Sequence, residues 1–295
     1  MKLKFWGVRG SIASPGEKTA RYGGNTTCIE IRSDNNDLII LDGGTGIFPL
    51  AQTLLKELPL TAHIFNTHSH WDHIQGLPFF IPLFIPGNTL RLYGAYDPIA
   101  GAGPEHIMNV QLQYSYFPVR EVEMKSHFDY IALTPHQPLE IGAAIITPIM
   151  LNHPVVDMGY RIDCNGKSIF FTGDHEPYFN IYDSNEEGYE EYQTLIEEHR
   201  RSIIDAIRGV DIIIADSSYT QEEYLSKKGW GHGTFDSCIQ LAVDAGAKIL
   251  FCTHHEPTRS DDELERVFAE ALARNGEAAA ILDIRLAREG CEIII

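Results

Sequence analysis

The sequence predicts a single α/β domain made of two halves, each a sheet with helices, built around a shared site. Short apolar runs typical of buried strands recur along the chain, as at 62–65 and 210–215. Segments with apolar residues at helical spacing separate them, as at 47–57 and 235–245. With 295 residues and no internal repeat, low-complexity segment or linker, the chain is expected to form one domain over 1–295.

The composition is that of an ordinary soluble globular protein, with 44% apolar residues and a mean hydropathy of -0.15. No apolar run approaches the roughly 20 residues that a membrane span needs, and the first residues lack a signal-peptide core. Free thiols in a reducing compartment explain the five scattered cysteines, so a cytoplasmic protein is expected: Cys28, Cys164, Cys238, Cys252 and Cys291.

The formal net charge of -18 restricts the possible partners. So acidic a surface repels polyanions, which disfavours long nucleic acid as a substrate. A small anion drawn to bound cations remains compatible with this charge. No membrane partner is expected.

The first part of the chain is predicted to alternate strands with glycine turns and one helix. Strands are expected at 2–6, 28–32, 38–41, 62–65 and 90–94, with 28–32 and 38–41 paired as a β-hairpin and a helix at 47–57. Residues 95–130 have little sheet character and form a candidate cap, with a helix over 104–116. Aromatic residues in this cap could stack on a base, although core packing is the more common use of such a stripe.

The second part is predicted to return to strands and longer helices. Strands are expected at 131–133, 138–141, 144–151, 167–172, 210–215, 248–252 and 291–295. Helices are expected at 235–245 and 261–275, and at 186–207 within a second candidate insertion, 176–208. The apolar positions of that insertion predict packing against the sheet or against a partner subunit.

One stretch, Asn66 to Gly76, carries the most specific chemistry. It places three imidazoles and one carboxylate within six positions. On an extended segment His68 and His70 point to the same side and can bind one cation, while Asp72 and His73 reach a second. These ligands suit zinc, and also manganese or iron. The alternative, a histidine-rich surface loop, fits poorly with the apolar, strand-like residues before the motif.

This motif, followed by Gly76, resembles the signature of the metallo-β-lactamase superfamily. The resemblance implies an αββα sandwich of two mixed sheets with helices outside, and a dinuclear site at one edge. After a strand ending in Phe-Cys-Thr, His254 matches the last ligand better than His255. Asp42 either orients a metal-bound histidine or forms a turn and helix cap. The implied ligands are His68, His70 and His153 on one metal, Asp72, His73 and His254 on the other, and Asp174 between them.

The opening segments, Phe5–Ser11 and Arg21–Thr26, are similar to those of a bacterial branch near ribonuclease Z and the cyclic-nucleotide phosphodiesterases. In that branch a histidine in a Gly-His-x-Thr sequence contacts phosphate, which corresponds here to His232. His232 would then hold the phosphate and donate a proton; otherwise it caps a turn. The loop residues Arg9, Arg21 and Asn25 either contact phosphate or only shape their loops.

The resemblance implies a metal-dependent hydrolase whose nucleophile is a hydroxide bridging two divalent ions, with zinc expected and manganese or iron as alternatives. The expected substrate is a small anionic phosphodiester such as a 3′,5′-cyclic nucleotide, with Asp72 and His232 catalytic. A lactone, thioester or carboxyl-ester hydrolase is the alternative. Ribonuclease Z-like RNA processing is disfavoured because this sequence has no basic insertion that could hold RNA. A non-catalytic metal sensor is disfavoured because it would need an incomplete ligand set, whereas every expected ligand position is filled here. Such relatives commonly form homodimers.

Overall fold

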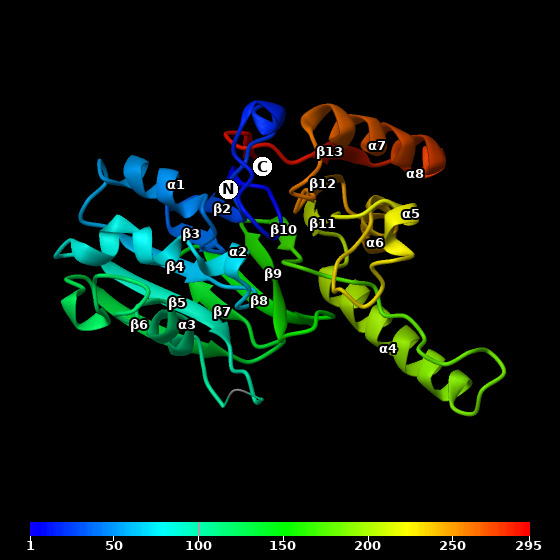
Figure 1. The fold of residues 1–295 in the computed structure, drawn as a ribbon, viewed down its shortest axis with the longest axis horizontal. Coiled ribbons are helices and arrows are strands. Elements are labelled where there is room, and N and C mark those ends of the chain that lie inside the picture. The colour runs from blue at the N-terminus through cyan, green and yellow to red at the C-terminus, as the bar shows by residue number, and fades with distance from the viewer. Residues whose placement is uncertain (100) are drawn as a thin grey trace.

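The computed structural model describes residues 1–99 and 101–295 and has four layers (Figure 1). Its described residues form two sheets of seven strands each, stacked face to face, with helices on the outer faces. The sheets are mixed, since both contain parallel and antiparallel pairs. The expected αββα sandwich is therefore confirmed.

The first sheet is built mainly from the first half of the chain. Its strands follow the order β14-β1-β2-β3-β4-β5-β6. The predicted hairpin is found, with Arg32 opposite Leu38, and β3 to β6 then run parallel. The bounds are β1 (Lys2–Gly7), β2 (Cys28–Arg32), β3 (Leu38–Leu41), β4 (Thr61–Phe65), β5 (Thr89–Ala95), β6 (His127–Leu133) and β14 (Glu292–Ile294).

The second sheet follows the order β13-β12-β11-β10-β9-β8-β7. Strands β10 to β13 run parallel, while β7, β8 and β9 form an antiparallel meander. The bounds are β7 (Leu139–Ile141), β8 (Ala144–Leu151), β9 (Asp157–Cys164), β10 (Lys167–Phe171), β11 (Ile212–Asp216), β12 (Ile249–Thr253) and β13 (Asp283–Leu286).

The helices cover the outer faces of the two sheets. Short single-turn helices η1 to η4 occur at Glu17–Thr19, Leu77–Phe79, Ile81–Phe84 and Glu121–Glu123. The α-helices are α1 (Ile47–Leu54), α2 (Trp71–Ile74), α3 (Glu105–Gln111), α4 (Tyr189–Ile207), α5 (Gln221–Tyr224), α6 (Phe235–Ala245), α7 (Asp261–Arg274) and α8 (Gly276–Ala279).

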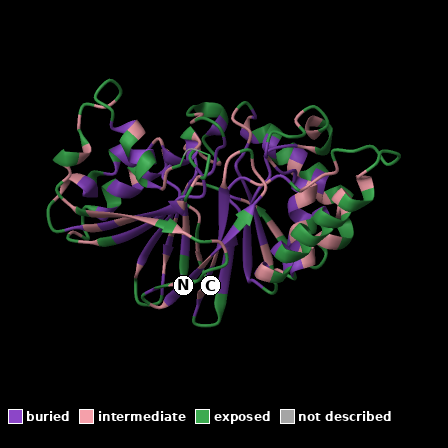
Figure 2. Cartoon of the chain, turned by 90° about the horizontal axis from the view of Figure 1, so that it is seen from below, coloured by how far each residue is buried: buried purple, intermediate pink, exposed green. Residues whose placement is uncertain are grey.

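Three apolar clusters match the layers, and Figure 2 shows the buried residues concentrated in the sheets. Phe5, Phe65 and Phe171 belong to the cluster between the sheets. A second cluster joins the outer face of the second sheet to α4, α6 and α7, and a third joins the first sheet to α1 and α3. Alternation along the strands explains this, because successive side chains point to opposite faces of a sheet.

The two candidate insertions differ from expectation in several places. Strand β6 begins at His127, four positions before the predicted strand, because residues 127–130 extend the parallel pairing with β5. Helix α3 is shorter than predicted, and residue 100 lies outside the described residues. The predicted 186–207 helix is confirmed as α4, and its buried Ile196, Ile203 and Ile207 pack within this chain. Strands β9 and β13 were not predicted.

The end of the chain forms a strap that crosses from the second sheet to the first. Residues 287–294 make up this strap. Ala287 N–H donates to Cys252 O (2.8 Å), and Gly290 N–H donates to Phe5 O (2.9 Å). Strand β14 then pairs antiparallel with β1. Among the helices in the described part of the chain, none is both long enough and apolar enough to cross a bilayer.

Candidate metal centre

The candidate ligands lie where strands end. Asp42 follows β3, His68 lies shortly after β4, and Asp174, Asp216 and His254 lie at or just beyond the ends of β10, β11 and β12. Because parallel strands end at the same edge of a sheet, each sheet brings its side chains to one edge. The stacked sheets then place both sets against each other, so that residues far apart in sequence form one site.

The first donor group consists of His68, His70, His153 and Asp174. Each offers one atom, and these atoms all lie within 4.8 Å of one another. His70 Nδ1 is 3.1 Å from His68 Nε2 and 3.0 Å from His153 Nε2. Asp174 Oδ2 is 3.6 Å from His68 Nε2. Three imidazoles and a carboxylate thus converge on one point.

The second donor group consists of Asp72, His73, His254 and Asp174. His254 Nε2 lies 3.0 Å from Asp72 Oδ2 and 3.2 Å from Asp174 Oδ1. His73 Nε2 lies 3.3 Å and 3.2 Å from the same two oxygens. Asp174 contributes Oδ1 here and Oδ2 to the first group, which is how a carboxylate bridges two ions.

The donor atoms fit a pair of divalent cations. Within the described chain, His73 Nε2 and Asp174 Oδ1 are buried without a hydrogen-bond partner. Buried polar atoms are normally satisfied, and a cation at the second group would satisfy both of these. Imidazole and carboxylate donors suit zinc, and also manganese or iron. The two groups are therefore consistent with a dinuclear metal centre.

Neighbouring polar groups hold the other nitrogen of each buried histidine. Asp42 Oδ2 lies 2.8 Å from His73 Nδ1, so Asp42 orients that histidine. Its oxygens also accept from the backbone and the hydroxyl of Thr67. Asp157 Oδ1 lies 3.0 Å from His68 Nδ1. These contacts fix the ring planes and direct each Nε2 towards the centre.

The histidines of the second sheet are held in the same manner. Gly231 O lies 2.9 Å from His153 Nδ1, and Ser218 Oγ lies 2.8 Å from His254 Nδ1. A side chain at residue 231 is excluded, because its Cβ would lie 2.3 Å from His153 Nδ1. Each of these two rings therefore depends on a loop from elsewhere in the chain.

Two site residues adopt left-handed backbone conformations that are costly for residues other than glycine. Asp42 has φ 60° and His254 has φ 57°. Such conformations cost about 1–3 kcal/mol and occur preferentially at functional sites. The opening loop supports this arrangement, because Ser11 N–H donates to Asp72 Oδ2 (2.7 Å) and a Cβ at Gly10 would lie 2.3 Å from His254.

His232 lies over the centre outside the two main donor groups. Its Nδ1 is 2.9 Å from Asp216 Oδ2, and its ring stacks on that of His254 at 4.9 Å. Burial lowers the pKa of His232, but the carboxylates of Asp216 and Asp174 outweigh this and raise the pKa to about 9. The Nδ1 of His232 therefore pairs with a carboxylate, which leaves its Nε2 for a different partner.

His232 also belongs to a third set of donors, with Asp174, Asp216 and His254. The atoms of Asp216 are already engaged, since Oδ1 accepts from Ser218 Oγ (2.7 Å) and Oδ2 faces His232. The geometry thus makes Asp216 the partner of His232.

The alternative last ligand, His255, points away from the centre. Its Nε2 donates to Ala287 O (2.8 Å) in the strap, and burial lowers its pKa to about 3. His254, not His255, faces Asp72 and Asp174. The structure therefore favours the register proposed from the sequence.

The burial of Arg9 contradicts its expected contact with substrate, whereas that of Asn25 stays a prediction. Arg9 is 0% exposed, and its guanidinium donates to Gly23 O and Asp261 Oδ1. Asn25 donates from its backbone and side chain to Glu289. Arg21 pairs with acidic residues of α7. These side chains tie the opening loop to the C-terminal part of the molecule.

Two site residues escaped the sequence analysis, Asp157 and Asp216, and Glu176 had no assigned role. Asp216 lies at the end of a buried strand, as Asp42 and Asp174 do, and that shared position could have identified it.

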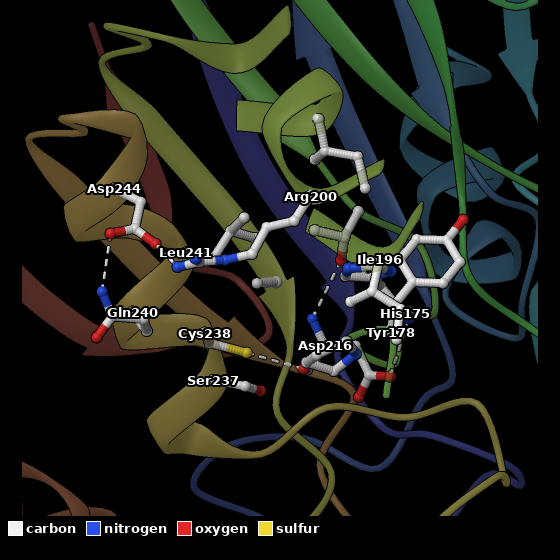
Figure 3. A pocket seen from close by; sticks show the side chains of 14 residues that line it. His175, Tyr178, Ile196, Arg200, Asp216, Ser237, Cys238, Gln240, Leu241 and Asp244 are labelled. Atoms are coloured by element: carbon white, nitrogen blue, oxygen red, sulfur yellow. Dashed lines mark hydrogen bonds and ion pairs between the residues drawn. The ribbon is translucent and has the colours of Figure 1, made fainter. Parts of the chain in front are cut away.

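Asp216 and His175 also line a cavity between α4 and α6, which Figure 3 shows. The volume of this cavity is about 140 Å³. Burial lowers the pKa of His175 to about 4, and its Nδ1 accepts from Asn152 N–H (3.2 Å). His175 is thus a neutral structural residue.

Of the first candidate cap, the part before residue 108 lies next to the centre. A cavity of about 60 Å³ touches His68 and Ser69 on one side and residues 102–107 on the other. The aromatic residues farther along do not form its wall, since Tyr114 and Tyr116 are exposed and Phe117 packs on Phe79.

Comparison with known proteins agrees with this geometry. Residues 38–255 match the family described as the beta-lactamase superfamily domain. A ribonuclease Z from Lachnoclostridium phytofermentans is 24% identical over 289 residues, covering 84% of this chain and 90% of the relative.

Two solved structures resemble the whole chain. The metallo-beta-lactamase fold protein YhfI from Bacillus subtilis has a TM-score of 0.67 and 21% identity, covering 99% of each chain. Yeast PDE1 has a TM-score of 0.64 and 17% identity, covering 100% of this chain and 99% of that one. Together with the donor groups, these matches show that the chain belongs to the beta-lactamase superfamily and is a metal-dependent hydrolase with the metallo-β-lactamase fold.

Proposed function

We propose that the protein is a dinuclear phosphodiesterase that hydrolyses a small anionic phosphodiester. The pairing of His232 with Asp216 beside the shared carboxylate Asp174 is the observation that carries this proposal. His232 can thus donate a proton, while the two donor groups remain available to bind metal ions. Cleavage of a P–O bond uses such a donor, because the departing alkoxide is a poor leaving group unless it is protonated.

The chain's own residues have distinct parts in this reaction. Two divalent ions held by the donor groups would polarise the phosphate and lower the pKa of the attacking water. Asp72 accepts a proton from that water, which adds to phosphorus. His232 donates a proton to the ester oxygen that leaves, and Asp216 holds His232 by its Nδ1. One P–O bond forms and one breaks, so an acyclic diester gives a monoester and an alcohol, and a cyclic diester gives one monoester that carries the released hydroxyl.

The metal centre is enclosed by neutral and acidic groups, and this supports a small substrate. Arg9, the nearest arginine candidate in the opening loop, is fully buried and engaged. The phosphate charge is therefore met by the cations and by His232. With a net charge of -18, the chain is poorly suited to hold a long RNA. A 3′,5′-cyclic nucleotide combines a single diester with small size, and is the substrate we propose.

The proposal is tested by parallel turnover assays on zinc- or manganese-loaded protein. We expect hydrolysis of bis(p-nitrophenyl) phosphate and of a cyclic nucleotide, abolished by a chelator, and little hydrolysis of p-nitrophenyl acetate or a lactone. Turnover of the acyl substrates without diester cleavage would instead assign the protein to carboxyl-ester or lactone hydrolysis.

His232→Ala and Asp216→Asn separate the proton donor from the metals. Both should retain two ions per chain and lose about 10²- to 10⁴-fold in diester turnover, the usual contribution of a general acid. Unchanged turnover in His232→Ala would remove this residue from the mechanism. Loss of an ion in that variant would show that His232 is a ligand.

A further inference from the structure

A cavity of about 280 Å³ opens beside His153 of the first donor group and is lined by no other residue of either group. Three segments that are distant in sequence line it. These are the loop after β8, the segment 176–181 with Tyr192 of α4, and the loop of Gly229 and Gly231. His153 is the residue that it shares with the metal centre.

The ring of His153 connects this cavity to the centre. Its Nε2 lies 3.0 Å from His70 Nδ1 in the first donor group. Its Nδ1 faces Gly231 O at 2.9 Å, in the wall of the cavity. A ligand with its phosphate at the centre therefore needs to extend past only one imidazole ring to reach the cavity.

The wall opposite the glycines is aromatic and apolar. Tyr178, Phe179 and Tyr192 line it, together with Ile181, whose side chain is 64% exposed. Aromatic side chains of this kind stack on the faces of planar rings, including nucleobases.

One lysine lies against the wall of this cavity. Lys228 Nζ lies 4.2 Å from the ring centroid of Phe179, which lines the cavity. In a chain with a net charge of -18, this positive charge favours an anionic ligand beside Phe179 over a neutral one.

The glycine wall is held in place by a buried carboxylate. Glu176 Oε1 accepts from Tyr224 Oη (2.6 Å) and Gly229 N–H (2.8 Å), and Oε2 accepts from Gly231 N–H (2.8 Å). The backbone of Glu176 also bonds to Asn152, beside His153. The cavity therefore has a fixed shape before any ligand arrives.

We infer that this cavity is a subsite for a planar aromatic substituent of a phosphate-containing ligand, with Phe179 and Tyr192 as specificity-determining residues. The inference rests on the proposed function only for the phosphate at the metal centre. The aromatic group is a nucleobase or a simple aryl ring, and both share the chemistry of a flat, polarisable face.

Calorimetric titration of the metal-loaded protein tests this inference without turnover. Adenosine 5′-monophosphate is compared with ribose 5-phosphate, which lacks the base, and p-nitrophenyl phosphate with methyl phosphate. We expect at least one aromatic ligand to bind about tenfold more tightly than its partner. An advantage confined to the first pair identifies a nucleobase site, and one in the second pair an aryl site.

Substitutions in the cavity test whether the tighter binding of the aromatic ligands depends on its residues. Phe179→Ala and Tyr192→Ala should reduce it to about threefold or less and leave ribose 5-phosphate and methyl phosphate unchanged. Phe179→Leu, which keeps apolar volume without a ring, should lose the advantage while remaining folded. Phe48→Ala, an exposed phenylalanine of α1, is the matched control and should change nothing.

Failure of the subsite is distinguishable from failure of the proposed function. Equal binding within both pairs, with diester hydrolysis intact, would overturn the subsite alone. An aromatic advantage lost in Phe179→Ala but without diester hydrolysis would support the subsite and overturn the proposed function. Absence of binding by all four phosphates, together with absence of diester hydrolysis, would overturn both.

Discussion

The two sheets contribute to the metal centre in different ways. After β4, the first sheet supplies His68, His70, Asp72 and His73 within six consecutive positions. The second sheet supplies its donors from three separate loops, after β8, β10 and β12. The first set shares one short segment of backbone, although Ser11, Asp42 and Asp157 contact its side chains from elsewhere in the chain. The second set depends on contacts between loops.

This difference shows where the centre is vulnerable. The donors of the first sheet share a short backbone, so one substitution leaves the others in place. In the second sheet, His153 relies on Gly231, which relies in turn on Glu176. We therefore expect substitutions in the first half to affect single ions, and substitutions in the loop ties of the second half to affect geometry and turnover.

The largest effect is expected from Asp174→Ala, because Asp174 belongs to both donor groups. Both ions should be lost or weakened, and diester turnover should fall about 10³-fold, equivalent to about 4 kcal/mol. Metal analysis by mass spectrometry and kinetics measure the two effects. Asp163→Ala, in β9 and paired with Arg161, is the control and should retain both ions. Full metal content in Asp174→Ala would show that the two groups do not share a carboxylate.

The next largest effect is expected from Asp42→Asn, which tests the metal-binding residues of the first half of the chain. This change keeps the size of the side chain but removes the charge facing His73 Nδ1. Such substitutions typically weaken metal affinity 10- to 100-fold. We expect one ion to be weakened and the other retained, as measured by competition with a chromophoric chelator. Equal weakening of both ions would contradict the view that donors of the first half act singly.

A smaller effect is expected in the second half from Glu176→Gln. The amide loses one acceptor and places a donor against the N–H groups of Gly229 or Gly231. We expect about 1–3 kcal/mol of lost stability and about a tenfold fall in kcat with both ions retained. Thermal unfolding, metal analysis and kinetics report these separately. A fall in stability with unchanged kcat would restrict Glu176 to a structural role.

The smallest effect is expected from Tyr224→Phe, which removes one donor to Glu176 and leaves the two backbone donors. About 0.5–1.5 kcal/mol of stability should be lost, with kcat within about threefold of wild type. The comparison with Glu176→Gln separates the hydroxyl contact from the backbone contacts. A larger loss of stability in Tyr224→Phe would show that Glu176 is held mainly by its contact with α5 rather than by the backbone of the glycine loop.

The sequence predicted the strands and most of the donors because their signals are local. Apolar runs fixed nearly all strands, including β8 and the β2–β3 hairpin, within one or two residues. The contiguous motif identified His68 to His73 directly, whereas His153, Asp174 and His254 needed the resemblance to a family. Strand β13 escaped because its alternation is short and half exposed.

Interactions between distant segments were beyond the sequence. Asp157 and Glu176 act through contacts with loops that lie 89 and 55 positions away, which no local pattern encodes. Arg9 was misassigned for the same reason. An arginine in a glycine-rich loop fits a phosphate contact as well as a buried ion pair, and only the position of α7 with Asp261 distinguishes them.

The C-terminal strap has a consequence for how the molecule opens. Residues 287–294 join the sheets, and Ala287 O accepts from His255, the neighbour of His254. Local opening of this segment would therefore release the loop that carries one metal-binding histidine, so the two form one cooperative unit. Because ligands stabilise the states that bind them, ion occupancy should slow amide hydrogen exchange in the strap itself. The far end of the chain thus becomes a reporter of a centre to which it contributes no donor atom.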